Sequence, residues 1–144
     1  MTQDKMARVW QRFKDIMEYN DEDLAKFKAN PRFMSMFATP SFRTHKIVFE
    51  VIQSHGCVCQ HRVGQRIVLN GNAALLSEEC PQQMCIGLVS QLPNIVFPIW
   101  ERMVAGLDPN GVLINTIGCT DVGIDCGGWG RVVAKVYVEG PENK

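Results

Sequence analysis

The sequence has no long apolar run, no excess of charge of either sign and no secretory pattern at its start. No stretch reaches the roughly 18 consecutive apolar residues of a membrane-spanning helix. The 15 Lys and Arg residues balance 15 Asp and Glu residues, which leaves no basic face for nucleic acid. The first residues, MTQDKMARVWQRF, mix charges into the apolar pattern, unlike a signal peptide. These absences predict a cytoplasmic protein that binds neither membranes nor nucleic acids.

Several motifs of well-defined chemistry are also missing. No Gly-x-Ser-x-Gly elbow supports serine hydrolase chemistry, and no Cys-x-x-Cys pair supports thioredoxin-like exchange. No glycine-rich segment ends in the Lys-Ser/Thr of a phosphate-binding loop. The sequence therefore names no reaction, and whether the protein is an enzyme stays open.

The chain of 144 residues is long enough for one domain with a sizeable core. Its beginning reads as helical, because apolar residues recur at spacings of three and four from Asp4 to Tyr19. Asn20 or Asp21 can cap a second short helix. Asn30-Pro31 ends that helix and can begin a third helical turn. The pattern predicts a helical prefix over residues 1–44, packed on the main domain.

Four later segments are rich in β-branched and aromatic residues, as strands are. In chain order they are KIVFEVIQ, RIVLNGN, VLINTIG and RVVAKVYVE. Between the second and third, one helix is predicted to begin at Pro81 and another to cover residues 94–106. We therefore predict an α+β fold: a small, mostly antiparallel sheet of about four strands covered by helices, with residues 45–144 and the prefix forming one compact unit.

The six cysteines occur as three pairs, and the first 56 residues contain none. The pairs lie in HGCVCQHRVG, EECPQQMC and GCTDVGIDCGGWG, and comprise Cys57 and Cys59, Cys80 and Cys85, and Cys119 and Cys126. In a reducing compartment clustered thiols favour metal binding or catalysis over a disulfide framework.

The first pair cannot bind one ion together with His61 from a straight strand. Cys57, Cys59 and His61 would share one strand face, but the outer two would lie about 13 Å apart. Zinc takes its ligands at about 2.0–2.3 Å, so the chain must bend between Gly56 and Gly64 if these residues bind one ion. Buried thiols beside a hydrogen-bonded imidazole are the alternative interpretation.

The second pair includes a candidate nucleophile. A helix beginning at Pro81 would place Cys80 at its N-cap, where free N–H groups and the helix dipole stabilise a thiolate. Cys80 could then act as a ligand, or as a nucleophile with His61 or His55 as its base. Cys85, past one helical turn, would point away from Cys80 or pack in the core.

The third pair does not match the spacing of a zinc ribbon, in which paired ligands are two to four residues apart. Its glycines are explained by a turn between two strands. Asp121 and Asp125 could form a carboxylate pair, but Asx-turns account for them more simply.

Four of these motifs together resemble a family of small bacterial and archaeal proteins, frequent in anaerobes and without an assigned biochemical activity. The matching pieces are NDEDLAKFKANPR, GCVCQHRVG, CPQQMC and GLDPNGVLINTIGCTDVGIDCGGWGR, and the resemblance covers most of residues 19–138. It implies a shared site and selects Cys57, His61, Cys80 and Cys119, with Cys85 and Cys126 in the closer relatives. Cys59 lies outside that pattern and ranks below them.

Three functional hypotheses follow. In the first, Cys57, His61, Cys80 and Cys119, with Cys85 and Cys126, hold an iron–sulfur cluster or zinc at one end of the sheet. Such a protein would serve as an accessory subunit or electron-transfer partner of a larger enzyme, or form a homo-oligomer. The second is a cysteine-dependent enzyme with Cys80 as nucleophile and His61 as base. In the third, the thiols are buried and the protein is a metal-free interaction protein.

Overall fold

A computed structural model describes residues 3–141 of the chain. It divides the protein into two compact units, one up to Ala38 and one from Thr39 onwards. The sequence-based division lay a few residues later, between residues 44 and 45. The short helix α4 (Ser41–Thr44) belongs to the second unit, where Phe42 is buried and its ring centroid lies 5.9 Å from that of Trp100.

The first unit consists of three helices: α1 (Gln3–Met17), α2 (Asp21–Ala29) and α3 (Pro31–Ala38). The start of α2 confirms the predicted cap. The Asn20 side chain accepts a hydrogen bond from the Asp23 N–H at 2.8 Å, and the Asp23 carboxylate accepts one from the Asn20 N–H at 3.3 Å. This reciprocal pair satisfies two amide groups that would otherwise lack partners at the helix start.

Aromatic rings join these three helices. Trp10 of α1 stacks on Phe37 of α3 with ring centroids 4.5 Å apart, and Phe27 of α2 stacks on Phe33 at 5.6 Å. None of the residues within the three helices is buried. Apolar residues that recur along the first helix therefore contact aromatic rings of the other two helices, and they remain partly exposed because the unit is small.

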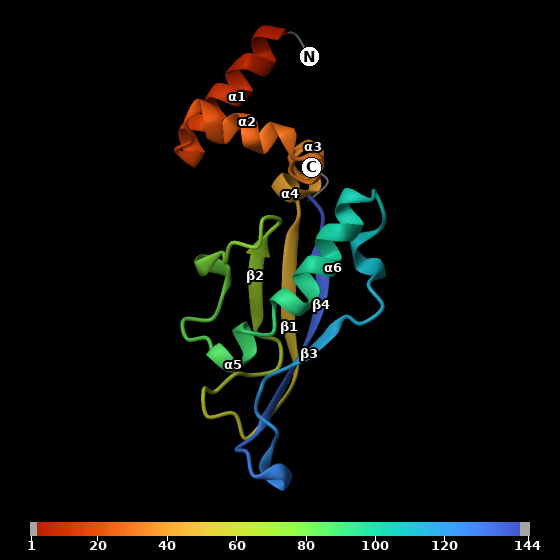
Figure 1. Ribbon diagram of the computed structural model, residues 1–144. Coiled ribbons are helices and arrows are strands. Elements are labelled where there is room, and N and C mark those ends of the chain that lie inside the picture. Colours follow the sequence, from red (N-terminus) through yellow and green to blue (C-terminus); the bar gives the residue numbers. More distant parts are fainter. Residues whose placement is uncertain (1–2, 142–144) are drawn as a thin grey trace. The chain divides into compact units, whose positions relative to one another are not determined.

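The second unit contains a four-stranded antiparallel sheet, which confirms the predicted α+β fold (Figure 1). Its strands are β1 (Lys46–His55), β2 (Arg66–Asn70), β3 (Thr116–Gly118) and β4 (Arg131–Glu139), in the order β2-β1-β4-β3. The long strands β1 and β4 lie side by side in the centre. Loops that join β1 to β2 and β3 to β4 therefore leave the sheet at the same end.

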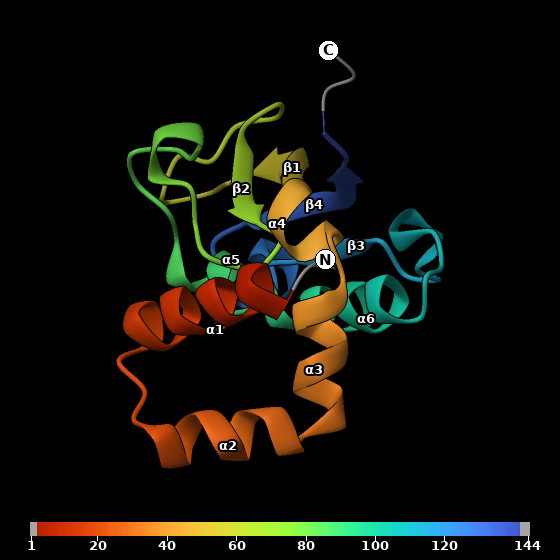
Figure 2. The same cartoon turned by 90° about the horizontal axis from the view of Figure 1, so that it is seen from above.

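The core lies between the sheet and helix α6 (Pro93–Val104), which crosses one face of the sheet in both views (Figures 1 and 2). In the centre of that face, Phe49 of β1 is paired with Ile67 of β2 and with Val136 of β4, and all three are buried. Ile95 and Ile99 of α6 are buried as well. Period-two alternation in the strands and a helical stripe in α6 together build this core.

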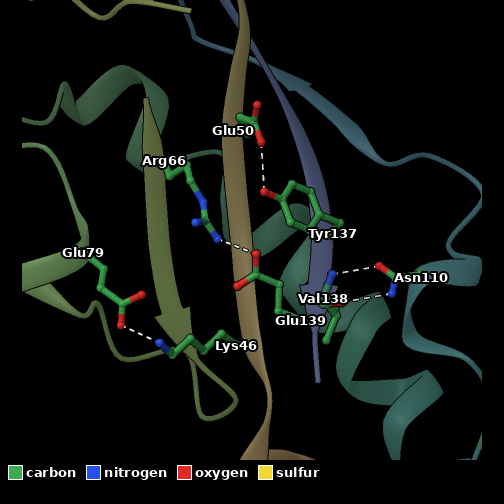
Figure 3. Close-up of polar contacts among 8 residues, drawn as sticks. All are labelled: Lys46, Glu50, Arg66, Glu79, Asn110, Tyr137, Val138 and Glu139. Atoms are coloured by element: carbon green, nitrogen blue, oxygen red, sulfur yellow. Dashed lines mark hydrogen bonds and ion pairs between the residues drawn. The ribbon is translucent and has the colours of Figure 1, made fainter. Parts of the chain in front are cut away.

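Polar side chains link the strands of the sheet (Figure 3). Tyr137 donates a hydrogen bond to Glu50 at 2.8 Å, and burial raises the pKa of its hydroxyl, with that bond adding to the shift. Arg66 and Glu139 form an ion pair at 2.5 Å that spans from β2 to β4. Because these side chains are part exposed, the ion pair adds at most a modest stabilisation.

Strand β3 is shorter than the predicted segment 112–118, because a side chain takes the place of its first residues. Asn110, in the turn η2 (Pro109–Gly111), donates to the Val138 carbonyl at 3.0 Å and accepts from the Val138 N–H at 2.7 Å (Figure 3). The backbone groups of β4 at that position are thus satisfied without a strand. Leu113, freed from pairing, is almost fully exposed at 99%.

The helix predicted to begin at Pro81 is also shorter than expected. The chain forms a 3₁₀ turn, η1 (Ser77–Glu79), and helix α5 covers only Ile86–Val89. Cys80 is extended, with φ −112° and ψ 159°, as residues before proline generally are. The prediction of Cys80 at a helix N-terminus is therefore wrong. Among residues 3–141, no helix has the length and apolarity needed to cross a bilayer.

Candidate functional site

Two loops meet at the end of the sheet where β1 stops and β4 starts. His55 and Arg131 are paired across these strands. The start of the loop of residues 56–65 therefore lies beside the end of the loop of residues 119–130 (Figure 1). Their backbones touch: a Cβ added to Gly130 would lie 2.1 Å from the His55 carbonyl oxygen. Glycine is required here because only a residue without a side chain allows this approach.

The first of these loops bends as the site requires. Gly56 has a φ of +62°, and the Cys57 carbonyl accepts a hydrogen bond from the Gln60 N–H at 3.0 Å, which closes a turn. The chain thus bends between Gly56 and Gly64, which is the condition that the sequence set for these residues to share one ion. Side chains that would be far apart on a straight strand can therefore face one cavity.

A third segment, residues 80–89, is bound to both loops. The Cys85 N–H donates to His61 Nε2 at 3.0 Å, and the Thr120 N–H donates to the Gly87 carbonyl at 3.1 Å. A Cβ on Gly87 would lie 2.6 Å from the Thr120 hydroxyl oxygen, so this close contact also depends on glycine. Three segments distant in sequence thus form one set of walls.

These walls enclose a small cavity of about 50 Å³. Four thiols line it, together with the His61 ring: Cys57, Cys59, Cys85 and Cys119. A cavity needs about 10–15 Å³ of such space to hold one water molecule, and pockets for metabolite-sized ligands usually exceed about 300 Å³. The cavity therefore suits an ion or a very small group.

His61 is buried, with 3% of its surface exposed, and both ring nitrogens are engaged. Since Nε2 accepts from the Cys85 N–H, the ring proton lies on Nδ1, which bonds the Gln65 side-chain oxygen at 3.1 Å. That oxygen also accepts from the Arg62 N–H at 3.1 Å, which fixes the orientation of the Gln65 amide. In this arrangement His61 positions the loop and Cys85, and offers no lone pair to a metal ion.

The environment of the thiols affects their acidity and their contacts with the backbone. The pKa of the Cys59 thiol is raised, first by the neighbouring Cys85 side chain as a hydrogen-bond partner, and also by desolvation and by the charges of Cys85 and Cys57. Cys119 Sγ accepts from the Val132 N–H at 3.3 Å. Within residues 3–141 no three His, Cys, Asp or Glu side chains already surround a common point as metal ligands would.

Two of the predicted site residues lie elsewhere. Cys80 Sγ accepts from the Val68 N–H at 3.3 Å and donates to the Val68 carbonyl at 3.4 Å, so it binds the backbone of β2. Cys126 is exposed in the turn η3 (Ile124–Cys126). Neither lines the cavity with His61, and the proposed pairing of Cys80 with His61 loses its geometric basis. Cys59, which ranked below them, does line it.

Asp121 holds the loop of residues 119–130 in shape. Its carboxylate accepts hydrogen bonds from the N–H groups of Gly123 at 3.0 Å, Trp129 at 3.1 Å and Gly130 at 3.2 Å. These bonds, led by the one from Gly123, lower the pKa of Asp121. The expected Asx-turn is thus present, and the carboxylate closes the loop that carries Cys119.

We expect this loop to loosen in acid. The pKa of Asp121 is lower in the folded protein than in the unfolded chain. The charged carboxylate therefore stabilises the loop fully at pH values above the pKa of the unfolded chain, about 3.9. This stabilisation is lost as the pH falls through the lower pKa of the folded protein. Amide chemical shifts of Gly123 and Gly130, followed by NMR from pH 7 downwards, should report one transition below about pH 4.

Two variants test the origin of this transition. Asp121→Asn should remove it, because the substituted side chain carries no charge to lose. Asp125→Asn, in the same loop, should leave it in place, because Asp125 accepts none of the three bonds. A transition that persists in Asp121→Asn would contradict this assignment.

The fold and the cavity define a small α+β protein with a thiol-lined site at one end of an antiparallel sheet. The chain matches no protein-family model, no curated protein and no solved structure.

Proposed function

We propose that the protein binds a metal through Cys57, Cys59, Cys85 and Cys119, and that it serves a larger enzyme as an accessory subunit or electron-transfer partner. The observation that carries the proposal is the convergence of four thiols, from three segments, on one small cavity. Four thiolates are a ligand set typical of zinc and of iron–sulfur centres.

We expect the thiols to reach a common ion through rotation of their side chains. A cysteine side chain has one rotatable bond that moves its sulfur, and rotation between staggered positions leaves the backbone unchanged. The backbone around the cavity is already fixed by the bonds from Cys85 to His61 and from Thr120 to Gly87. Deprotonation and rotation of the thiols on binding would complete the site.

This ligand set differs from the one read in the sequence. Cys59 is included, whereas Cys80 and Cys126 are not. His61 is no longer a ligand; it orients the loop through its hydrogen bonds, as groups around metal ligands commonly do. The four thiolates suit a single zinc ion or a small iron–sulfur cluster, and the metal content decides between them.

Metal content provides the test. Protein purified without oxygen should carry one zinc ion per chain by elemental analysis, or iron and sulfide with a visible absorption band. Replacing the four cavity cysteines by serine should reduce the metal to background. Since a structural zinc site contributes on the order of 10 kcal/mol to folding, chelation should also lower the melting temperature of the wild-type protein markedly.

The chain contains its own controls. Cys126→Ser and Cys80→Ser each remove a thiol outside the cavity, so both variants should retain the metal. Equal metal loss in these controls, or no metal in wild-type protein supplied with zinc and with iron and sulfide, would defeat the proposal and leave the thiols as metal-free surface and core groups.

The partner surface that we propose adjoins the thiols. Val58, Val63 and Trp129 line a groove next to the cavity together with Arg62, and the Trp129 side chain is 72% exposed. Tagged protein recovered from its own cells should retain a stoichiometric, identified enzyme subunit. Trp129→Ser should release that subunit, while Leu113→Ser, at an even more exposed apolar position outside this groove, should not. Release by both variants or by neither would argue against this surface.

A further inference from the structure

We infer that Cys59 and Cys85 form a reversible disulfide when a low-molecular-weight disulfide reaches the cavity. Both residues line one space of about 50 Å³, and they come from two segments that are distant in the sequence. Both residues are part exposed, so a small oxidant can approach them.

The backbone between the two residues is already restrained. His61, two residues after Cys59, accepts the N–H of Cys85 at 3.0 Å. A disulfide requires the two Cα atoms to come within about 4.4–6.8 Å. One hydrogen bond already holds the two segments together, which favours this approach of the two Cα atoms.

The other thiols are less suitable partners. Cys80 binds both backbone groups of Val68, and Cys126 is exposed outside the cavity. Cys57 and Cys59 are separated by one residue and share one tight turn.

Cys119 also lines the cavity, but its sulfur accepts the Val132 N–H at 3.3 Å. The pair of Cys59 and Cys85 joins the two walls that the bond from Cys85 to His61 already connects.

The chemistry is an ordinary exchange. One cysteine thiolate attacks the small disulfide, whose S–S bond breaks, and one small thiol leaves with a proton. The second cysteine then attacks the mixed disulfide, and the second small thiol leaves. Two protein thiols are oxidised to one disulfide, while the small disulfide is reduced by the same two electrons. A dithiol such as dithiothreitol reverses the reaction.

The consequence for the metal rests on the proposed function. If Cys59 and Cys85 are ligands, their oxidation removes two of the four thiolates, and the metal leaves. The bond would then act as a redox switch on metal loading. The disulfide itself can form whether or not a metal binds.

Peptide mapping can test the pair. The full-length protein is treated with glutathione disulfide, its remaining thiols are alkylated, and it is digested with trypsin. Cleavage after Arg62, Arg66 and Arg102 leaves Cys57 and Cys59 in one peptide, and Cys80 and Cys85 in another. The two peptides should be recovered linked, lighter by two hydrogens than their sum, and the number of free thiols should fall by two.

Two double variants identify the sulfurs. Cys57→Ser with Cys80→Ser should keep the link and lose it in dithiothreitol. Cys59→Ser with Cys85→Ser should give no link between these peptides. Absence of the link in the first variant, or an equal yield in the second, would overturn the inference. Fragmentation spectra of the linked wild-type peptides give the same assignment if a variant fails to fold.

Metal analysis of the same samples separates the two proposals. In zinc-loaded wild-type protein, metal loss should accompany the appearance of the linked peptides and reverse with dithiothreitol. Linked peptides from a protein that binds no zinc before oxidation would support the disulfide and reject the metal site. Bound metal with no link after oxidation of metal-free protein would reject the disulfide alone.

Discussion

Replacing Phe49 by alanine is expected to lower the free energy of unfolding by about 3–5 kcal/mol, the usual range for a buried aromatic side chain. Phe49 is fully buried in the central strand β1, and it is paired with Ile67 on one side and Val136 on the other. The cavity left by the ring would lie in the middle of the sheet. Urea denaturation, followed by circular dichroism, measures the change.

A matched control lies three residues further along the same strand. Ile52 is 46% exposed, next to a register shift in the pairing of β1 with β4. Ile52→Ala should therefore cost well under half as much, since exposed positions contribute little to stability. Equal losses in the two variants would mean that the core does not centre on Phe49.

Gly130→Ala should have the largest effect on the site. The added methyl carbon would lie 2.1 Å from the His55 carbonyl oxygen and 2.3 Å from the Gly56 carbonyl carbon, so the two loops must separate. We expect a loss of about 3 kcal/mol or more, at the upper end of the cost of overpacking. The cavity thiols should react faster with a thiol reagent, and metal affinity should fall.

Gly64→Ala separates this clash from simple backbone strain. Gly64 has a φ of +87° but no atom within 4 Å of an added Cβ. Its substitution should cost about 1–2 kcal/mol through the left-handed conformation alone. Thiol reactivity should stay close to that of the wild-type protein. If Gly64→Ala exposed the thiols as strongly as Gly130→Ala, contact between the two loops would not be what closes the cavity.

Local signals in the sequence were sufficient to predict several helices and strands. The Asn20 cap and the proline of Asn30-Pro31 set the limits of α2 and α3, and the prediction held because both signals act within one helical turn. The segment RVVAKVYVE forms β4 over its full length, because its alternating side chains suit a strand with a buried face. The fold class followed from the order of these segments.

Elements that depend on distant partners were harder to predict. Strand β3 is short because the Asn110 side chain forms hydrogen bonds with the N–H and the carbonyl of Val138. No local pattern in the sequence predicts this contact. The segment after Cys80 is not helical before Ile86, because Cys85 bonds His61 and Cys80 bonds Val68, although Pro81 is a good first residue for a helix. Tertiary hydrogen bonds outweighed local helix preference at this point.

The candidate site also combines features that local sequence predicts with features that depend on tertiary contacts. The sequence alone marked three cysteine-bearing segments, the bend between Gly56 and Gly64, and a turn rather than a self-contained knuckle at Cys119. Cys59 carried a signal in its Cys-x-Cys spacing, but Gln65, Gly87 and Thr120 carried none, because their roles exist only in contacts with residues far along the chain.

The tertiary structure decided which thiols meet. In an antiparallel sheet, the loop after β1 and the loop before β4 leave at the same end, and this brings Cys57 and Cys59 to Cys119. The bond from Cys85 to His61 adds the fourth thiol, while hydrogen bonds to Val68 hold Cys80 on the edge strand β2. The sequence determined which segments carry thiols, and the pairing of the strands determined which of these thiols lie close together.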